Sequence, residues 1–326
     1  MSASATVLTA PPTAPRSRQN TGEGRFALLI LAPGVVVLLA VIVLPMLATM
    51  RQALFGDPGL DPATGFVNPT APFVGLDNFR RVLALDNGRF WRDLLNTTVL
   101  AFATVLLETV IGTAMALVMN QALKARALIR VSVLIPWAIP SALSGVMWGW
   151  VLSANGIVNS ILPIKVLWTA DGVPALFAVI FADTWKSAPF LALLVLAGLQ
   201  TIPGEVYEAA RVDGAGAWRR LISITLPLVR PALVVAVLFR LLDALRMFDL
   251  PYVLIGPRKE SVETLSMVSQ DEAGGLHYGM AASYAIALFV FIFLIVFIFV
   301  RFLGADILGS TGSGVSRRHR RQEAVV

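Results

Sequence analysis

The stretch EAARVDGAGAWRRLISITLP runs from Glu208 to Pro227, between two apolar segments that are each long enough to cross a bilayer. Its charges and small residues place it in water, because ionisable side chains are costly in hydrocarbon. Pro203 favours a helix start just upstream, and Gly214 allows the chain to turn. A second short helix is expected over Ala217–Ile222, with Pro227 as its stop. The sequence therefore predicts a water-exposed helical hairpin inside a membrane protein.

The composition supports a polytopic membrane protein. The chain has 326 residues, of which 57% are hydrophobic and 14% charged, and its mean hydropathy is +0.77. A soluble domain carries about 25% charged residues. Cysteine is absent and the two histidines are His277 and His319, so disulfides, cysteine metal sites and histidine clusters are excluded. The predicted fold class is an all-α integral membrane protein.

Six apolar stretches reach the length of about 20 residues that crosses ~30 Å of hydrocarbon. Residues 1–24, rich in Ala, Ser, Thr and Pro, predict a disordered tail. The membrane domain is expected over residues 25–304 and a basic tail over 305–326. The predicted spans are residues 26–48, 97–119, 131–152, 175–199, 231–249 and 280–302.

The distribution of Lys and Arg orients these spans. Fifteen of these residues fall on the side of the two termini and eight on the opposite side, where Asp and Glu dilute them. The positive-inside rule then predicts a multi-pass protein of the plasma (inner) membrane with both termini in the cytoplasm. This orientation accounts for the net charge of +6, so nucleic acid is not an expected partner. The loop of residues 201–227 is accordingly expected to face the cytoplasm.

A fixed spacing within this loop carries a resemblance. Glu-Ala-Ala is followed after three residues by Gly and, nine residues later, by Ile-x-Leu-Pro; the matched positions are Glu208, Ala209, Ala210, Gly214, Ile224, Leu226 and Pro227. This pattern resembles the EAA loop of ABC importer permeases, and it implies their type I fold of six transmembrane helices. The resemblance also implies a coupling helix that docks into the ATP-hydrolysing subunit, whereas the residues alone fit a hairpin resting on the membrane surface equally well. The positions implied to couple to the ATPase are Glu208, Ala209, Ala210, Arg211, Asp213, Gly214 and Arg219.

Other stretches are similar to the sugar-importing branch of that family, of the trehalose and maltose type. They include LIPWAIPSALSGVMW in the third predicted span, DTWKSAPF in the fourth and FRLLDALRMFDLPYVL in the fifth. The similarity covers roughly Phe26–Phe302. One departure is LIGPRKESVETLS, which has a single Gly where the family often has a Gly-Gly-Pro turn, so contacts of the outer loops are not carried over.

The resemblance implies one permease subunit of an ATP-driven importer for a disaccharide such as trehalose or maltose. An extracytoplasmic solute-binding protein delivers the sugar, a second permease subunit completes the pathway, and two copies of an ATP-binding subunit drive it. The chain has no Gly-x4-Gly-Lys-Ser/Thr stretch and no nucleophile–base arrangement, so it is not expected to be an enzyme. No cofactor is expected in this chain, because the partner subunits bind ATP and Mg.

Ionisable residues inside the predicted spans are the candidates for a transport pathway. At ~1.5 Å per residue, Glu108, Lys186 and Arg240 each lie near the middle of the bilayer. Trp185 and Phe190, next to this depth, offer aromatic faces on which a sugar ring stacks. The candidate substrate-binding residues are Glu108, Asp183, Trp185, Lys186, Phe190, Arg240, Asp243 and Arg246.

Four residues of alternating charge follow one another at steps of three in the fifth predicted span: Arg240, Asp243, Arg246 and Asp249. Neighbouring members can meet on one helix surface. Over three steps the direction turns by half a circle, so the first and last members are not expected to face one cavity. The acidic and basic candidates balance in number, which favours a neutral solute over a phosphorylated one.

The third predicted span carries two prolines and three tryptophans. Pro136 and Pro140 predict a kink, which is one way to open a cavity. Trp148 and Trp150 lie near the outer end of the span and are expected in the interfacial aromatic belt.

Three other interpretations remain open. A permease for glycerol-3-phosphate or a polyol is the nearest alternative within the family. An ion-coupled secondary transporter also places charges at mid-membrane, but it works alone under an ion gradient. A membrane scaffold that recruits a cytoplasmic partner and moves nothing is the third.

Overall fold

The structure, a computed structural model, describes four segments of the chain: residues 21–59, 70–84, 88–121 and 126–304. The predicted tails fall largely outside the described residues, except that residues 21–24 already belong to the first helix. The chain divides into a unit of residues 1–49 and a unit of residues 50–326, which are described separately.

The described residues of the N-terminal unit, 21–49, belong to a single apolar helix. α1 (Thr21–Leu38) runs through the π-helical turn η1 (Leu39–Val43) into α2 (Leu44–Ala53). Its large apolar side chains are exposed along the length that can cross a membrane. Such a surface suits contact with lipid and accounts for the first predicted span.

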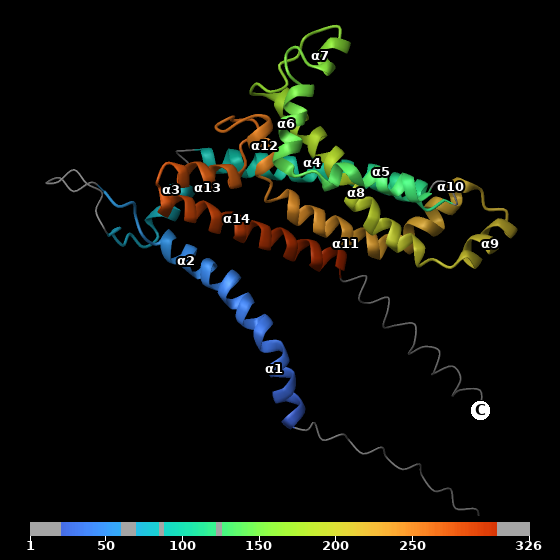
Figure 1. The fold of residues 1–326 in the computed structure, drawn as a ribbon, viewed down its shortest axis with the longest axis horizontal. Coiled ribbons are helices and arrows are strands. Elements are labelled where there is room, and N and C mark those ends of the chain that lie inside the picture. The colour runs from blue at the N-terminus through green and yellow to red at the C-terminus, as the bar shows by residue number, and fades with distance from the viewer. Residues whose placement is uncertain (1–20, 60–69, 85–87, 122–125, 305–326) are drawn as a thin grey trace, which may run out of the picture. The chain divides into compact units, whose positions relative to one another are not determined.

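The second unit is built on three long helices: α4 (Arg89–Met119), α8 (Val173–Gln200) and α11 (Leu226–Ala244), shown in Figure 1. α4 and α8 approach closely because Gly112 has no side chain, and a Cβ there would meet the carbonyl oxygen of Ala188. Gly198 serves the contact between α8 and α11 in the same way, since a Cβ would collide with Ala232. Small residues thus bring the three backbones together.

A second group of helices packs at the end of the bundle where α4 begins. α13 and α3 lie against the start of α14, and Gly279 of α14 contacts the backbone oxygen of Phe55 so closely that a side chain would not fit. Most large side chains along the rest of α14 are exposed, which suits lipid contact. The bounds are α3 (Asp77–Leu83), α13 (Leu265–Gly274), α14 (Tyr278–Phe299) and the π-helical turn η4 (Val300–Gly304).

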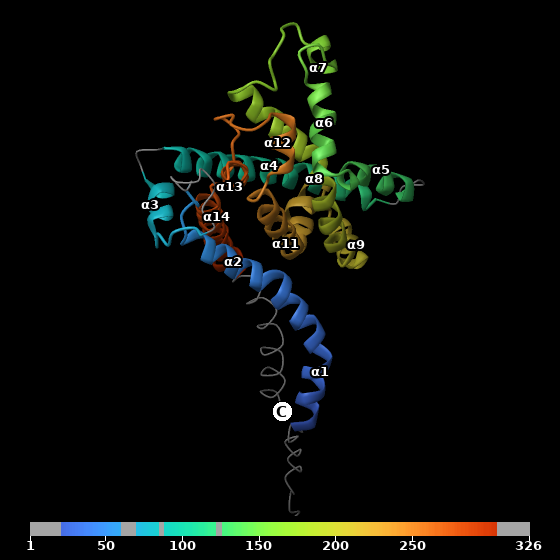
Figure 2. The same cartoon turned by 60° about the vertical axis from the view of Figure 1, so that its left-hand side comes forward.

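The third predicted span is broken into two helices. α5 (Arg126–Ala138) and α6 (Ser141–Val151) meet at an angle of 92°, with Pro140 at the break. The predicted kink is therefore present and sharp, while Pro136 is accommodated inside α5. α6 and the short α7 (Ile157–Ile161) project from the bundle in both views (Figures 1 and 2).

The predicted hairpin forms, but its second helix does not stop at Pro227. α9 (Gly204–Val212) is followed by a turn and then by α10 (Ala217–Arg220), which continues through the π-helical turn η3 (Leu221–Thr225) into α11. η3 changes the hydrogen-bond ladder just before Pro227, so the missing N–H and the ring fit in the first turn of α11. The expected stop at Pro227 is therefore wrong.

The fifth predicted span also ends earlier than expected, at Ala244 instead of residue 249. The chain turns through residues 245–248 and resumes as α12 (Asp249–Leu254). α12 packs along α6, where a Cβ at Gly145 would press on Val253 and on the carbonyl oxygen of Leu250. Within the described residues, five helices are long and apolar enough to cross a membrane, or six if the bent pair α5–α6 counts as one span.

Candidate functional site

The breaks in the third and fifth spans meet at one cavity of about 260 Å³. Non-helical backbone at membrane depth is tolerated where it is buried in protein or lines a polar cavity. Here the turn of residues 245–248 and the first residue of α6 both line the wall. The lining residues are Ser141, Asp183, Lys186, Ser187, Arg240, Asp243, Ala244, Arg246, Met247, Phe248, Asp249 and Leu250.

The cavity lies at the middle depth of the bundle. Lys186 is at the centre of the 28-residue helix α8, about 20 Å from either end at ~1.5 Å per residue. Asp183 is one turn away on the same helix and binds Arg240 of α11, which fixes the depth of both helices relative to each other. The sequence-based placement of Lys186 and Arg240 near mid-membrane is consistent with this geometry.

A buried ion cluster forms the back of the cavity. Nε and Nη2 of Arg240 donate to the two carboxylate oxygens of Glu108 at 2.7 and 2.8 Å. The same guanidinium donates to Asp183 at 3.1 Å and to Asp243 at 2.6 Å. Arg240 is 3% exposed and Glu108 is fully buried. These four residues, called the central ion cluster, join α4, α8 and α11 through one guanidinium.

The front of the cavity carries charges that are open to solvent. The side chains of Asp243 and Arg246 are 59% and 69% exposed and lie 3.4 Å apart. Lys186 is half-buried, and its ammonium group has no hydrogen-bond or ion-pair partner among the residues that the structure describes. Ser187 adds a hydroxyl that donates to Asp183 at 3.5 Å. The wall therefore offers both donors and acceptors to a polar solute.

The four residues of alternating charge are arranged differently from the prediction. Neighbouring members do meet, since Asp243 contacts both Arg240 and Arg246. Arg240 and Asp249, however, line the same cavity, which contradicts the expectation that they face apart. The expectation assumed one helix through residue 249, and the turn after Ala244 redirects the chain.

The aromatic candidates lie beside the cavity and not in its wall. The ring of Phe190 stacks on Trp137 at 5.5 Å, and Trp185 contacts Trp148 edge-to-face at 5.6 Å. Trp148 is buried against α8, so the belt position expected for it is wrong, whereas Trp150 is exposed. Trp148 and Trp150 lie on α6, so the direction of their rings depends on the bend between α5 and α6, which their positions in the sequence do not reveal.

Sequence reasoning missed several lining residues because they are not ionisable. Ser141 and Ser187 add hydroxyl groups, and Phe248 adds an aromatic ring from the turn after α11. The signal for Ser141 was the proline just before it, since a break at Pro140 exposes the first backbone N–H groups of α6. Phe248 had no such signal.

The hairpin presents its candidate coupling residues at the surface. Gly214 adopts a positive φ of 75°, and the N–H of Ala215 donates to the carbonyl oxygen of Ala210 at 2.9 Å, which closes the end of α9. Ala210 is buried, and the other candidates Glu208, Ala209, Arg211, Asp213, Gly214 and Arg219 are exposed. Two apolar side chains that the sequence analysis did not single out, Val212 and Trp218, are 88% and 73% exposed on the same hairpin.

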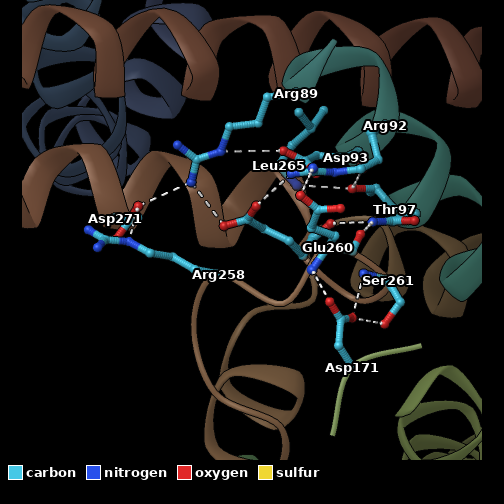
Figure 3. Close-up of polar contacts among 12 residues, drawn as sticks. Arg89, Arg92, Asp93, Thr97, Asp171, Arg258, Glu260, Ser261, Leu265 and Asp271 are labelled. Atoms are coloured by element: carbon cyan, nitrogen blue, oxygen red, sulfur yellow. Dashed lines mark hydrogen bonds and ion pairs between the residues drawn. The ribbon is translucent and has the colours of Figure 1, made fainter. Parts of the chain in front are cut away.

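A second ion cluster lies at the rim where α4 begins, and Figure 3 shows its contacts. Arg89 pairs with Glu263, Asp271 and Glu272 at 2.9–3.1 Å, and Arg92 pairs with Asp93, Glu260 and Glu263 at 3.0–3.1 Å. Together with Arg258, which contacts Asp271, these residues are called the rim ion cluster. They line most of an open cavity of about 580 Å³.

Next to the rim ion cluster, Asp171 joins the segment before α8 to the segment before α13. Its carboxylate accepts hydrogen bonds from the hydroxyl and N–H groups of Ser261 and from the N–H of Glu260 (Figure 3). The Ser261 hydroxyl is the main reason that the pKa of Asp171 is below its usual value. No cluster of three or more His, Asp or Glu suited to a metal ion is found in the described part of the chain.

Comparison with known proteins assigns the chain to a family. Residues 108–309 match the family described as "Binding-protein-dependent transport system inner membrane component". The chain is 39% identical to the trehalose/maltose transport system permease protein MalF of Thermococcus litoralis, over 84% of this chain and 92% of that protein. It is 34% identical to the trehalose transport system permease protein SugA of Mycobacterium tuberculosis, over 92% and 95%.

The fold has a match among solved structures. A chain of a bacterial ABC transporter for import of the acidic polysaccharide alginate superposes with a TM-score of 0.71, at 23% identity, over 87% of this chain and 96% of that one. The relatives are permease proteins and not enzymes, as the sequence analysis expected of this chain. From the family match and these relatives, the chain belongs to the inner membrane components of binding-protein-dependent ABC transport systems.

Proposed function

We propose that the chain is one of two permease subunits of an ATP-driven sugar importer, and that its cargo is a disaccharide such as trehalose or maltose. The observation that carries this proposal is the polar cavity at mid-depth, where two spanning helices break. The relatives named for trehalose and maltose transport support the choice of cargo. A solute-binding protein delivers the sugar, and two copies of an ATP-binding subunit supply the energy.

The charges of the wall favour a neutral sugar over a phosphorylated solute. Three basic and three acidic residues line the cavity: Lys186, Arg240, Arg246, Asp183, Asp243 and Asp249. The guanidinium of Arg240 is already bound to three carboxylates, so it is not available to an anion. A phosphorylated solute needs a clear excess of free guanidinium groups. Sugar hydroxyls, which donate and accept, match a wall of this kind better.

The size of the cavity supports a pathway shared with a second subunit. Ligand pockets typically measure ~300–1,000 Å³. The cavity formed by this chain alone, about 260 Å³, lies just below that range, and two of its charged residues are open to solvent. A second permease subunit facing this wall enlarges and closes the site.

The hairpin is the proposed joint with the ATPase. Its exposed ionic residues, Glu208, Arg211 and Arg219 among them, supply directional contacts, and Val212 and Trp218 supply apolar surface for a cleft in the partner. Because α10 and η3 continue into α11 as one helix, a movement of the hairpin passes directly to Arg240 and the cavity. Both termini and this hairpin lie in the cytoplasm in the proposed orientation.

Uptake by the reconstituted complex tests the proposal. Proteoliposomes that hold the whole complex, with the binding protein on one side and ATP on the other, are expected to accumulate labelled disaccharide. Glycerol 3-phosphate is not expected to compete. Lys186→Ala should reduce uptake while the ATPase subunits remain bound, because the variant removes a donor from the cavity wall. Uptake that follows a clamped ion gradient and ignores ATP would instead support a secondary transporter.

The joint is tested in the same vesicles. Glu208→Lys should uncouple ATP hydrolysis from uptake or release the ATPase subunits, since it reverses an exposed charge at the proposed contact. Glu205→Lys is the matched control, because Glu205 is also exposed and lies one turn away on α9, outside the candidate set. If both variants take up sugar at the rate of the unsubstituted chain, the hairpin is not part of the coupling mechanism.

A further inference from the structure

The turn of residues 245–248, which forms one wall of the mid-depth cavity, contains a buried carbonyl group that its own helix cannot satisfy. Met247 lines the cavity and is 8% exposed. In a continuing helix its carbonyl oxygen would accept from the N–H four residues later, but that residue is Pro251, which has no N–H group. A buried carbonyl group without a donor is costly. The turn therefore needs a donor from another part of the chain.

Thr264 supplies this donor. Its hydroxyl group donates to the carbonyl oxygen of Met247 at 3.0 Å and accepts from the N–H of Met267, in the first turn of α13, at 3.3 Å. A hydroxyl group has one proton and two lone pairs, so it serves both partners at once. Thr264 is 1% exposed, so water does not compete for these bonds. The side chain thus joins the cavity wall to the start of α13.

The next residue ties the same point to α4. The N–H of Leu265 donates to the hydroxyl oxygen of Thr97 at 3.0 Å, and this hydroxyl donates to the carbonyl oxygen of Asp93 at 2.7 Å (Figure 3). Thr97 and Leu265 are 1% and 0% exposed. Two buried hydroxyl groups, and the main chain between Thr264 and Leu265, therefore connect α4 to the wall of the cavity.

Two further contacts hold the segment that precedes α13. The side-chain amide of Asn96 donates to the carbonyl oxygens of Glu260 and Glu263 at 2.7 and 3.1 Å. From the segment before α8, Asp171 accepts from the N–H and hydroxyl groups of Ser261 (Figure 3). The bonds from Asn96 are made to main-chain oxygens, so they do not depend on how the charges of the rim ion cluster are paired.

We infer that Thr264 and Thr97 are positioning residues of the mid-depth cavity. Their hydroxyl groups hold the turn of residues 245–248, and with it the side chains that this turn presents to the cavity. Neither threonine is among the lining residues, so each acts through Met247 and not through contact with the solute. This inference rests on the proposed function, because the cavity is the site proposed for the sugar.

Loss of the Thr264 hydroxyl leaves the carbonyl group of Met247 buried without a donor. Because α12 offers it no N–H, this carbonyl gains a new partner by turning towards water in the cavity. Arg246 and Phe248, on either side of Met247 in the chain, are lining residues and move with it. The shape of the wall therefore changes although no lining residue is substituted.

A single cysteine reports on the wall, because the chain has no other cysteine. Phe248→Cys in the intact complex is alkylated with N-ethylmaleimide, and the label is measured on this chain after the subunits are separated. Thr264→Val then replaces the hydroxyl with a methyl group of similar size. Thr104→Val is the matched control, since Thr104 is fully buried and its hydroxyl donates within α4, to the carbonyl oxygens of Leu100 and Ala101.

The inference predicts that Thr264→Val speeds the alkylation of Phe248→Cys several-fold. Thr104→Val should leave the rate unchanged, and so should Thr264→Ser, which keeps the hydroxyl. A rate in Thr264→Val no faster than in Thr104→Val would overturn the inference. If Thr264→Val does not accumulate in the membrane, Thr97→Val decides: it should also speed the alkylation, and the control rate there would overturn the inference as well.

Uptake gives the functional measurement, in a chain that keeps Phe248. Thr264→Val should lower ATP-driven sugar uptake several-fold with the ATPase subunits still bound, and Thr264→Ser should retain it. Lost uptake with an unchanged alkylation rate would assign Thr264 a structural role only and would overturn the inference. Alkylation needs no transport, so it tests the inference separately from the proposed function, which fails if the unsubstituted complex accumulates no sugar.

Discussion

The central and rim ion clusters use the same side chains in two different designs. In the central cluster one guanidinium, Arg240, serves three carboxylates and is 3% exposed. In the rim cluster Arg89 contacts four carboxylates and Arg92 contacts three, and the two guanidiniums share Asp93 and Glu263. The central cluster therefore depends on one residue, whereas the rim cluster has alternative partners for each.

Both clusters use α4, which makes their difference informative. Glu108 and Arg89 are separated along this helix by about 28 Å at ~1.5 Å per residue. The rim end reaches water, where counter-ions screen charge, while the central end is enclosed by α8 and α11. The same helix thus carries a contact that tolerates rearrangement at its end and one that does not at its centre. In a transporter, the central ion cluster suits helices that must move together as a unit.

Loss of the central guanidinium should have the largest effect. Arg240→Leu leaves the carboxylates of Glu108 and Asp183 buried without their cation, and removing one partner of a buried pair costs about 3–5 kcal/mol. Arg246→Leu is the matched control, because that side chain is 69% exposed and its pair contributes only about 0–1 kcal/mol. Thermal unfolding of the purified complex compares the two. Similar losses of Tm would show that burial does not distinguish them.

The charged part of the site could be predicted from the sequence, but its shape could not. Hydropathy and the cost of ionisable groups in lipid pointed to Glu108, Lys186 and Arg240, which do lie at one depth. The break after Ala244 left no trace, because Leu245, Met247 and Phe248 are compatible with a continuing helix. Tertiary contacts create it: the hydroxyl of Thr264 donates to the carbonyl oxygen of Met247 at 3.0 Å.

The long apolar helices and the turn of the hairpin were readable because they depend on local patterns. Apolar length predicts a span, and Gly214 can take the positive φ that the turn needs. The rim cluster depends on partners that are far apart in sequence, such as Arg89 and Glu263. The segment that contains Glu263 stood out only as a departure from the family pattern, and a single sequence does not pair it with α4.

Neutralising a shared carboxylate of the rim should have an intermediate effect. Glu263→Gln removes one of the two carboxylate charges that join Arg89 to Arg92, the other being Asp93, and hydrogen bonds to charged groups contribute about 1.5–3 kcal/mol each. The remaining carboxylates should restore part of this stabilisation. We therefore expect the free energy of unfolding to fall by about 1–2 kcal/mol, and this loss should shrink as the salt concentration rises. Glu260→Gln, at a side chain that is 74% exposed, is the control. A loss as large as that of Arg240→Leu would contradict the redundancy of the rim.

The smallest effect is expected beside the rim, at the pair of His277 and Asp57. Nδ1 of His277 lies 2.7 Å from Oδ2 of Asp57, which joins the start of α14 to the segment after α2. The hydrogen bond with Asp57 raises the pKa of His277, and the charge of Glu272 adds to this. Both side chains are more than a third exposed, so solvent and salt reduce the stabilisation.

The sign of this pH dependence is set by the direction of the shift. Because the pKa of His277 is higher in the folded chain, its stabilisation is fully present below the unfolded value of about 6.5 and disappears as pH rises through the folded value. Asp271 has the opposite sign: its hydrogen bond with Arg258 lowers its pKa, and its stabilisation is lost as pH falls towards the acid range. The Tm of wild type should therefore decline relative to His277→Gln as pH rises across neutrality. Parallel curves for the two proteins would show that the pair of His277 and Asp57 contributes nothing to stability.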